Sequence, residues 1–327
     1  MALKVLAAGL SDVGLLREHN EDSFAVLDRH GLYLVADGMG GHRAGAVASR
    51  MAADAMGAFF DSTMRDDATW PFHFDPSLSL EENRLITSIK VANRSIYEES
   101  ARNPDHRGMG TTVVGVLVLP QSGKVYVGHV GDSRCYRVRG GEIRQLTQDH
   151  SLVNEYLRAM PDLPPEQRDE LPRNVITRAL GMTEAVMVDL VADEAKADDV
   201  YVLCSDGLSG MVSDDEILSS VLRDDEPEVA CRTLVALAND HGGEDNVTAV
   251  VVRVLDGDRA SRRSRPSLDE TRQIALPAEP DPRAEAAHPS IDDDEGPTVE
   301  AQRSSVNPMG ETLPPPPLPD DPGDDEK

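Results

Sequence analysis

The chain has 327 residues and a formal net charge of −27. From Asp256 onward it carries 18 acidic against 8 basic residues, 13 of the 22 prolines and no Phe, Tyr or Trp. Such a composition cannot bury enough apolar surface to offset the entropy of ordering, so we predict a disordered tail over residues 256–327. The remaining charge of −17 lies on one predicted domain, residues 1–255. This acidic balance argues against nucleic-acid binding and against adhesion to anionic lipid.

The three cysteines, Cys135, Cys204 and Cys231, are isolated and odd in number. They are typical of reduced, buried thiols in a cytoplasmic protein and not of a disulfide framework or a zinc site. The N-terminus has one lysine and only a brief apolar run, so we expect a first strand there and not a signal peptide. The sequence contains no run of ~18 apolar residues, so we predict no membrane-spanning helix.

The first half of the chain predicts strands, then two helices, then more strands. Short apolar runs between glycine turns indicate strands, and apolar residues at helical spacing indicate helices. Residues 61–80, between the two helices, are predicted to be a surface loop. The predicted strands cover 5–10, 23–27, 32–36, 113–119, 125–130, 135–138 and 143–146, and the helices 44–60 and 80–102.

Residues 147–185 are proline-rich and irregular, with a short helix expected over 152–158, and we interpret them as an excursion over one edge of the domain. The strand pattern returns over 186–191 and 200–203. Ser213 to Glu216 has the spacing of a capping box, which predicts the start of a helix. A further helix over 227–239 and a last strand over 247–255 complete an α+β domain with antiparallel sheets buried against outer helices.

Acidic residues recur where buried strands end. The strand 32–36 ends on Asp37, followed by a glycine-dense turn, and the same pattern returns at Asp206. Each aspartate alone is explained as well by helix capping. Glu21 with Asp22 upstream, and Asp245 near the end of the domain, add further carboxylates. Such oxygen ligands, far apart in sequence, suit hard divalent cations.

Eight motifs occur in order: REHNED, ADGMGGH, GMGTT, GHVGDSRCYR, LTQDHS, NVITRALG, CSDGLSG and EDNVT. Together they resemble the metal-dependent protein phosphatases of the type 2C family, and closely the bacterial serine/threonine members. The resemblance covers about residues 5–255. It implies a four-layer αββα sandwich of two antiparallel β-sheets flanked by helices, with metals at one end. The excursion at 147–185 corresponds to the variable flap of that family.

The resemblance also implies roles for individual residues. Arg17, which is otherwise explained by a surface salt bridge, resembles the phosphate-binding arginine. Asn246 matches the supporting residue beside the last ligand. The implied metal ligands are Glu21, Asp22, Asp37, the Gly38 carbonyl, Asp132, Asp206 and Asp245, with Asp37 bridging two ions and Asp132 completing a third, weaker site with Asp206.

The chemistry agrees with this assignment. Oxygen-only ligands favour Mn²⁺ or Mg²⁺, and a water bridging two such ions is acidified enough to attack phosphorus. Arg17 and Asp37 are then the catalytic side chains, and no cysteine nucleophile is needed. Eukaryotic members carry a histidine directly after Asp-Gly, where this chain has Met39. The general acid is left open between His42, a metal-bound water and none.

The expected substrates are proteins bearing phosphoserine or phosphothreonine, with the enzyme opposing bacterial serine/threonine kinases. A catalytically silent, regulatory binding protein of the same fold is the alternative, which the retained acids disfavour. A nuclease is disfavoured by the acidic surface. In the tail, Thr271, Thr298 and Thr312 are either solvated disorder or sites that a partner kinase phosphorylates for phosphothreonine-reading domains.

Overall fold

The computed structural model describes residues 3–40, 43–63, 71–72, 74–161, 163–164, 167, 171–172 and 175–257. His42 and residues 64–70 of the predicted loop lie outside these ranges. The predicted tail also lies outside them, apart from Asp256 and Gly257. The division into a domain over 1–255 and a tail over 256–327 therefore stays a prediction.

A five-stranded antiparallel sheet contains the first and last strands of the domain side by side. β1 pairs with β11 along its whole length, from Leu3 opposite Asp256 to Asp12 opposite Val247. The valine-rich β11 is buried over most of its length, as a central strand must be. The strand order is β1 (Leu3–Asp12), β11 (Val247–Asp256), β10 (Val200–Cys204), β7 (Arg134–Arg139), β8 (Glu142–Gln145).

The second sheet has six strands. Its hairpins follow the glycine turns of the sequence, and β6 pairs with both β5 and β9. The last strand begins at Asp189, three residues later than the predicted 186–191. The order is β2 (Asp22–Leu27), β3 (Leu32–Met39), β5 (Val113–Leu119), β6 (Lys124–Val130), β9 (Asp189–Glu194), and β4 (Gly110–Thr111) pairs with the end of β3.

The two sheets face each other across an apolar core. Tyr33 and Val35 of β3 belong to the same buried cluster as Tyr201 and Leu203 of β10. These side chains alternate along their strands with residues that face the helices, since neighbouring side chains point to opposite faces of a sheet. Both sheets are therefore buried on both faces, which explains the continuous apolar runs in the sequence.

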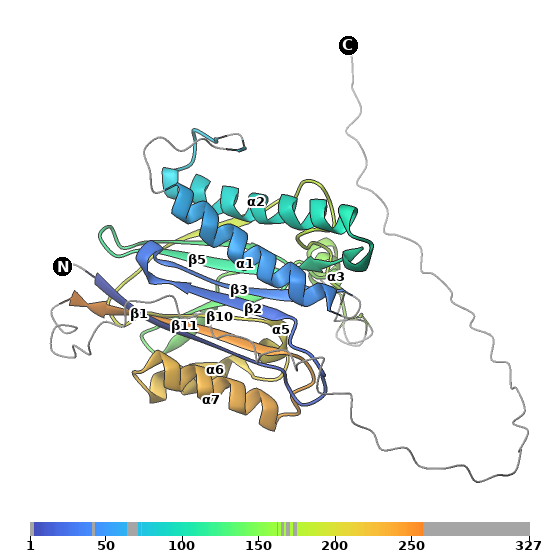
Figure 1. The fold of residues 1–327 in the computed structure, drawn as a ribbon. Helices are drawn as coiled ribbons and strands as arrows, with labels where there is room; N and C mark the ends of the chain where they lie inside the picture. Colours follow the sequence, from blue (N-terminus) through green and yellow to red (C-terminus); the bar gives the residue numbers. More distant parts are fainter. Residues whose placement is uncertain are drawn as a thin grey trace, which may run out of the picture. The chain divides into compact units, whose positions relative to one another are not determined.

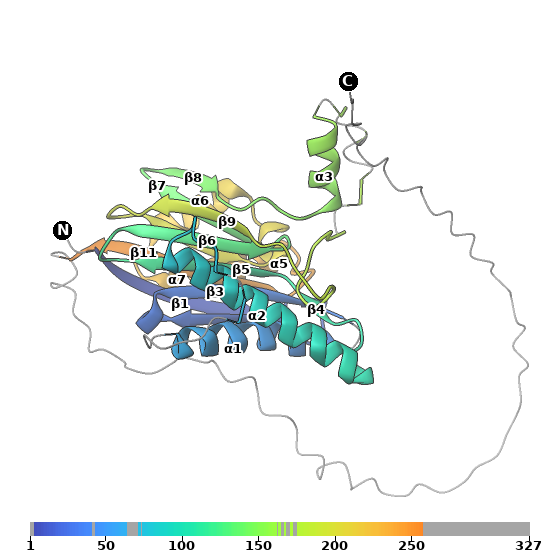
Figure 2. The ribbon, with the colours of Figure 1, turned by 90° about the horizontal axis from the view of Figure 1, so that it is seen from above.

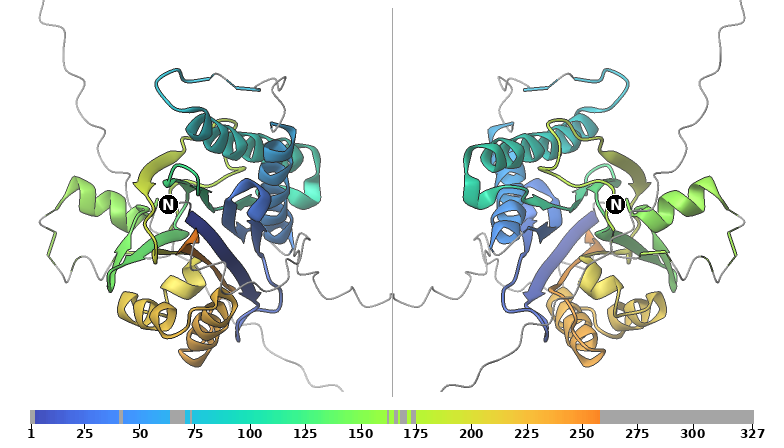
Figure 3. Two further views of the ribbon diagram at one scale, coloured as in Figure 1. Left: turned by 90° about the vertical axis from the view of Figure 1, so that its left-hand side faces the viewer. Right: turned by 90° about the vertical axis from the view of Figure 1, so that its right-hand side faces the viewer.

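Helices cover the outer face of each sheet (Figures 1 and 3). α1 (Ala44–Ser62) and α2 (Leu80–Arg102) cover the six-stranded sheet, and α1 buries Ala48, Ala52 and Met56 at four-residue spacing. On the five-stranded sheet lie α5 (Asp206–Ser209), α6 (Asp214–Arg223) and α7 (Pro227–Asp240). This arrangement confirms the predicted αββα sandwich.

Several local predictions can be checked directly. The capping box at Ser213 and Glu216 is formed, and a second one at Ser79 and Glu82 begins α2. All three cysteines are free and buried. No helix in the described ranges has the length and apolar character needed to cross a membrane.

The segment predicted as a flap contains α3 (Leu152–Ala159), which stands clear of the four layers in Figure 2. No residue of α3 is buried. Short 3₁₀ turns at Asp28–His30 and Pro104–His106 complete the described elements.

Candidate metal centre

Four strand ends bring the predicted carboxylates to one end of the sandwich. Asp37 is near the end of β3, Asp132 is in the turn from β6 to β7, and Asp206 is the first residue of α5, two positions after the end of β10. Asp245 lies two residues before β11. In Figure 1 this end, marked by α5, is opposite the N-terminus.

Asp22 and Asp37 are cross-strand neighbours, directly opposite each other in the pairing of β2 with β3. The Asp22 Oδ2 atom accepts hydrogen bonds from the hydroxyls of Ser205 (2.8 Å) and Thr248 (2.6 Å). Burial, followed by the charges of Asp206 and Asp245, raises the pKa of Asp22 to about 7 despite these two bonds. Two like charges opposite each other destabilise a sheet unless a cation lies between them.

Asp37 and Asp206 lie close enough for their carboxyl groups to share a hydrogen bond. Burial and the charge of Asp22 raise the pKa of Asp37 well above its usual range, and burial also raises that of Asp206. The Asp37 backbone is held firmly, since its carbonyl accepts from the Thr112 amide (2.8 Å) and the Thr111 hydroxyl (2.8 Å). The carboxyl group is therefore fixed at the strand end.

Three buried carboxylate oxygens in this region have no hydrogen-bond partner among the described residues. They are Oδ1 of Asp22, Oδ1 of Asp132 and Oδ1 of Asp206. Burial, then the charge of Asp206, raises the pKa of Asp132 to about 7. Buried carboxylates are normally paired or coordinate a metal. Oxygen donors without partners are what Mg²⁺ and Mn²⁺ require, so these residues fit a divalent ion.

Gly38 of the DGMGGH turn and Gly45 of α1 permit close backbone approach beside Asp37. A Cβ atom at Gly38 would lie 2.2 Å from the Gly45 carbonyl oxygen and 2.5 Å from that of Glu21. A Cβ at Gly45 would lie 2.4 Å from the Glu21 carboxylate. The Gly38 amide also donates to the Glu21 carbonyl (3.1 Å). Glu21 is thereby held against the end of β3.

Arg17 and Asn246 tie the loop between β1 and β2 to the residues that precede β11. The Arg17 guanidinium donates to Oδ2 of Asp245 at 2.7 Å. The buried Asn246 donates from Nδ2 to the carbonyls of Val13 and His19, and its Oδ1 accepts from the Glu21 amide. The backbone amide of Asn246 donates to Oδ1 of Asp245 (2.8 Å), so both oxygens of that carboxylate already have donors.

The carboxylate oxygens of Asp37, Asp206 and Asp245 do not form a compact group of possible ligand atoms. Within the described ranges, the one group of three His, Cys, Asp or Glu side chains with ligand atoms all within 4.8 Å is His129, His150 and Asp189. Asp245 is turned to Arg17 instead, although its charge still acts on Asp22 and Asp206. The close pair in the centre is Asp37 and Asp206.

The histidine group is poorly suited to a cation. Its two imidazole rings are stacked, with centroids 4.8 Å apart and planes 9° from parallel, so no single ion lies in both ring planes. The His150 Nδ1 lone pair accepts from the Gly131 amide (2.9 Å), which leaves its proton on Nε2. Arg178 already supplies positive charge to Asp189 (2.5 Å). His129 Nδ1 has no partner among the described residues.

Several supporting side chains were inside the quoted motifs but had no predicted role. Ser205 stands directly before Asp206 in CSDGLSG, Thr248 ends EDNVT, and Thr112 ends GMGTT. Each has a hydroxyl bonded to Asp22 or to the Asp37 backbone. A small hydroxyl residue in a motif with an acid was the available signal, but the partner lies up to 226 positions away.

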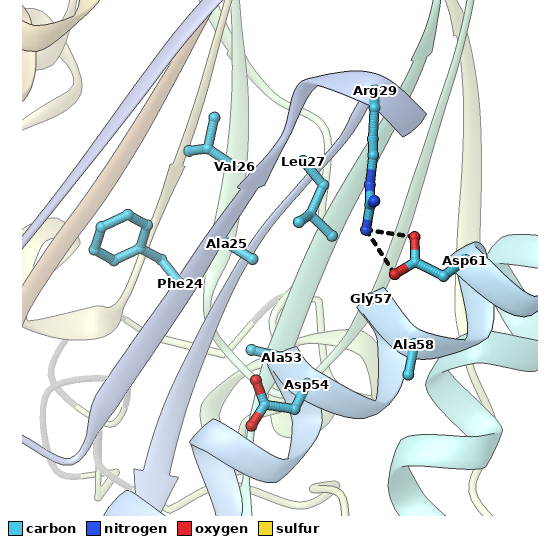
Figure 4. Close-up of a pocket in the computed structure, with 10 residues that line it drawn as sticks. All are labelled: Phe24, Ala25, Val26, Leu27, Arg29, Ala53, Asp54, Gly57, Ala58 and Asp61. Carbon is cyan, nitrogen blue, oxygen red and sulfur yellow. Dashed lines mark hydrogen bonds and ion pairs between the residues drawn. The ribbon is translucent and has the colours of Figure 1, made fainter. Parts of the chain in front are cut away.

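A separate cavity of about 270 Å³ lies between β2 and α1. Figure 4 shows residues that line it from β2 and α1, among them Ala25, Leu27 and Ala53, and the ion pair of Arg29 and Asp61. None of the predicted ligands lines it. It is therefore not part of the carboxylate cluster.

The sequence profile described as Protein phosphatase 2C matches residues 17–226. The chain therefore belongs to this family. Protein phosphatase PhpP of Streptococcus pneumoniae is 36% identical over 257 residues, which cover 76% of this chain and 97% of that protein. PstP of Mycobacterium tuberculosis, a serine/threonine protein phosphatase, is 38% identical over 251 residues, covering 77% of this chain and 45% of PstP. The chain is a bacterial-type member.

Solved structures agree with the sequence match. The crystal structure of the Mycobacterium tuberculosis serine/threonine phosphatase PstP/Ppp has a TM-score of 0.66 at 36% identity, covering 78% of this chain and 100% of that one. A structure of the PstP catalytic domain in complex with two manganese ions has a TM-score of 0.65, with the same identity and coverage.

Proposed function

We propose that this protein is a metal-dependent phosphatase that hydrolyses phosphoserine and phosphothreonine in proteins. The observation that carries the proposal is the set of buried, unpartnered oxygens of Asp22, Asp132 and Asp206 around Asp37. Family membership and the serine/threonine phosphatases among the relatives support the same activity.

The residues that would hold divalent ions are those implied by the family motifs. With Asp37 and the Gly38 carbonyl at the centre, Asp206 and Asp245 would complete one site and Glu21 and Asp22 would serve the other. Asp132 would join Asp206 in a third, weaker site. Bound there, Mn²⁺ or Mg²⁺ supplies the Lewis acidity that lowers the pKa of water and offsets phosphate charge. The two manganese ions in the PstP catalytic domain support a count of two.

Arg17 would bind the phosphate group. Its side chain is 55% exposed and directed to Asp245, so it can turn to a ligand in solution without breaking the core. A guanidinium matches two phosphate oxygens with two N–H donors. The ion pair with Asp245 would keep the Arg17 guanidinium beside the carboxylate cluster until a phosphate group takes the place of the Asp245 carboxylate.

The leaving group would be protonated by His42, by a metal-bound water or by no general acid at all. Met39 follows Gly38 at the end of β3, and it has no proton to give. His42 lies outside the described residues. A His42→Ala variant that keeps the wild-type rate on a phosphopeptide would exclude this residue as the general acid.

Partners and location are proposed on narrower grounds. Phosphoproteins are the substrates, and a serine/threonine kinase would be the opposing enzyme. Phosphorylation of Thr271, Thr298 and Thr312 falls on the undescribed tail and stays a prediction, tested by mass spectrometry of the native protein. Three unpaired, buried thiols support a reducing compartment, the cytoplasm.

The direct test is release of inorganic phosphate from a phosphothreonine peptide with Mn²⁺, compared with excess EDTA and with a phosphotyrosine peptide. We expect hydrolysis of the phosphothreonine peptide with metal and none in EDTA. Full activity in EDTA would contradict the proposal. Stabilisation by Mn²⁺ without turnover would favour the silent binding protein.

A further inference from the structure

The loop between β1 and β2 exposes two leucines directly before Arg17. Leu15 is 64% exposed and Leu16 is 70% exposed. Residues Leu15 to His19 are all exposed, although the glycine before them is buried. Two adjacent leucines in water cost free energy that a polar loop would avoid, so their position next to a charged residue of the site needs a reason.

The exposure is not caused by a loosely held loop. The amides of Leu15 and Leu16 both donate to the Gly243 carbonyl, at 2.8 and 3.3 Å. Gly14 has φ +77°, and a Cβ there would lie 2.2 Å from the Asp245 carbonyl oxygen. With Asn246 bonded to the carbonyls on both sides of the loop, the backbone is fixed. The two side chains are therefore presented to solvent in one place.

We propose that Leu15 and Leu16 form a contact surface for apolar residues that flank the phosphorylated residue of a substrate protein. This inference rests on the proposed function, with Arg17 as the phosphate-binding residue. Leu16 is bonded to Arg17, and consecutive Cα atoms are about 3.8 Å apart. The leucines are therefore within a few residues' length of any substrate chain whose phosphate contacts Arg17.

The charges around the two leucines favour the same substrates. Glu18 and Glu244 are exposed next to the loop, and each would repel an acidic side chain on the substrate. An apolar substrate residue that covers the leucine methyl groups stabilises the complex, by about 25 cal/mol for each Å² of apolar surface taken from water. The surface thus selects apolar over acidic flanking residues.

The test compares two phosphothreonine peptides that differ only beside the phosphorylated residue, with leucine or with serine on both sides. The measured quantity is the ratio of their kcat/KM values, in which any general loss of active protein cancels. We expect the wild type to prefer the leucine peptide by about tenfold, the effect of a modest apolar contact. We expect Leu15→Ser/Leu16→Ser to bring the ratio near one, through KM.

A matched control is Leu222→Ser, because Leu222 is 53% exposed on α6, a helix that covers the five-stranded sheet and is separate from the loop between β1 and β2. It should keep the wild-type ratio.

A second variant, Leu16→Lys, should favour a peptide with aspartate beside the phosphothreonine. A wild type without preference, or a double variant that keeps it, would overturn the inference. Failure of the proposed function is separate, since no peptide would then be hydrolysed.

Discussion

Two polar clusters that meet at the turn between β6 and β7 differ in how their buried charges are balanced. In the histidine cluster, Arg178 pairs with Asp189, and the Gly131 amide donates to His150. In the carboxylate cluster, acids from four strand ends lie together, and Arg17 forms an ion pair with Asp245. The first cluster contains its own cation, whereas three buried carboxylate oxygens of the second have no partner among the described residues.

The comparison shows that distance between ligand atoms is a weak guide to a metal site. The histidine group has the closer spacing, but its two rings are stacked and its aspartate is already paired with Arg178. The carboxylate group is less compact, yet three of its buried oxygens lack partners among the described residues. Unsatisfied buried charge, rather than spacing, distinguishes a site that binds a cation from one that only stabilises the fold.

The largest expected effect comes from removing one acid of the central pair. Asp206→Asn removes the charge of the acid beside Asp37, and we expect kcat to fall at least about a hundredfold. The measurement is phosphate release from a phosphothreonine peptide with Mn²⁺. Asp61→Asn is the control, because Asp61 is an exposed acid on α1 that pairs with Arg29. A loss below about fivefold for Asp206→Asn would remove this residue from the metal site.

Metal addition should stabilise the domain, and more so at higher pH. At a hundred times its Kd, Mn²⁺ adds about 2.7 kcal/mol, which corresponds to a rise in Tm of about 5–10 °C for a domain of this size. Without metal, burial raises the pKa of Asp22 and of Asp132 to about 7, so the folded state binds the extra protons.

The free energy of unfolding of the metal-free protein should therefore fall as pH rises from about 4 to 7. Thermal unfolding at pH 5.5 and 8 with and without Mn²⁺ checks both statements. A metal-free Tm that rises over this range, or a larger gain from Mn²⁺ at pH 5.5, would contradict the account of the cluster.

A smaller loss is expected from the residue that joins the exposed loop to the site. Asn246→Ala removes three hydrogen bonds of a buried side chain, and we expect the free energy of unfolding to fall by about 2–3 kcal/mol. Urea unfolding measures it. Asn154→Ala in α3 removes a partly exposed bond to the Asp149 carbonyl and should cost less than about 1 kcal/mol.

The smallest effect should come from the balanced cluster. Asp189→Asn breaks a half-exposed ion pair with Arg178, and we expect a loss of about 0.5–1 kcal/mol in the free energy of unfolding. The affinity for Mn²⁺, measured by calorimetry, should not change. A tenfold weaker affinity would place Asp189 in the metal site and reverse the distinction between the two clusters.

The local pattern of the sequence was sufficient for most elements. Helical spacing predicted α2 over 80–102, and the capping box predicted the start of α6, because both signals depend on residues three or four positions apart. The acids at strand ends and the order of the eight motifs led to the family and the sandwich. The strand predicted over 186–191 was displaced to Asp189–Glu194, because its limits depend on pairing with β6.

Only the tertiary structure decided how the site is assembled. Strand register places Asp22 opposite Asp37, and packing of the two sheets brings Ser205 and Thr248 to Asp22 from 183 and 226 residues away. The packing of the loop between β1 and β2 also places Arg17 against Asp245. A sequence pattern records which residues occupy each strand end. The neighbours of each charge depend on how distant strands pair and pack, and these neighbours determine which acids remain without a partner.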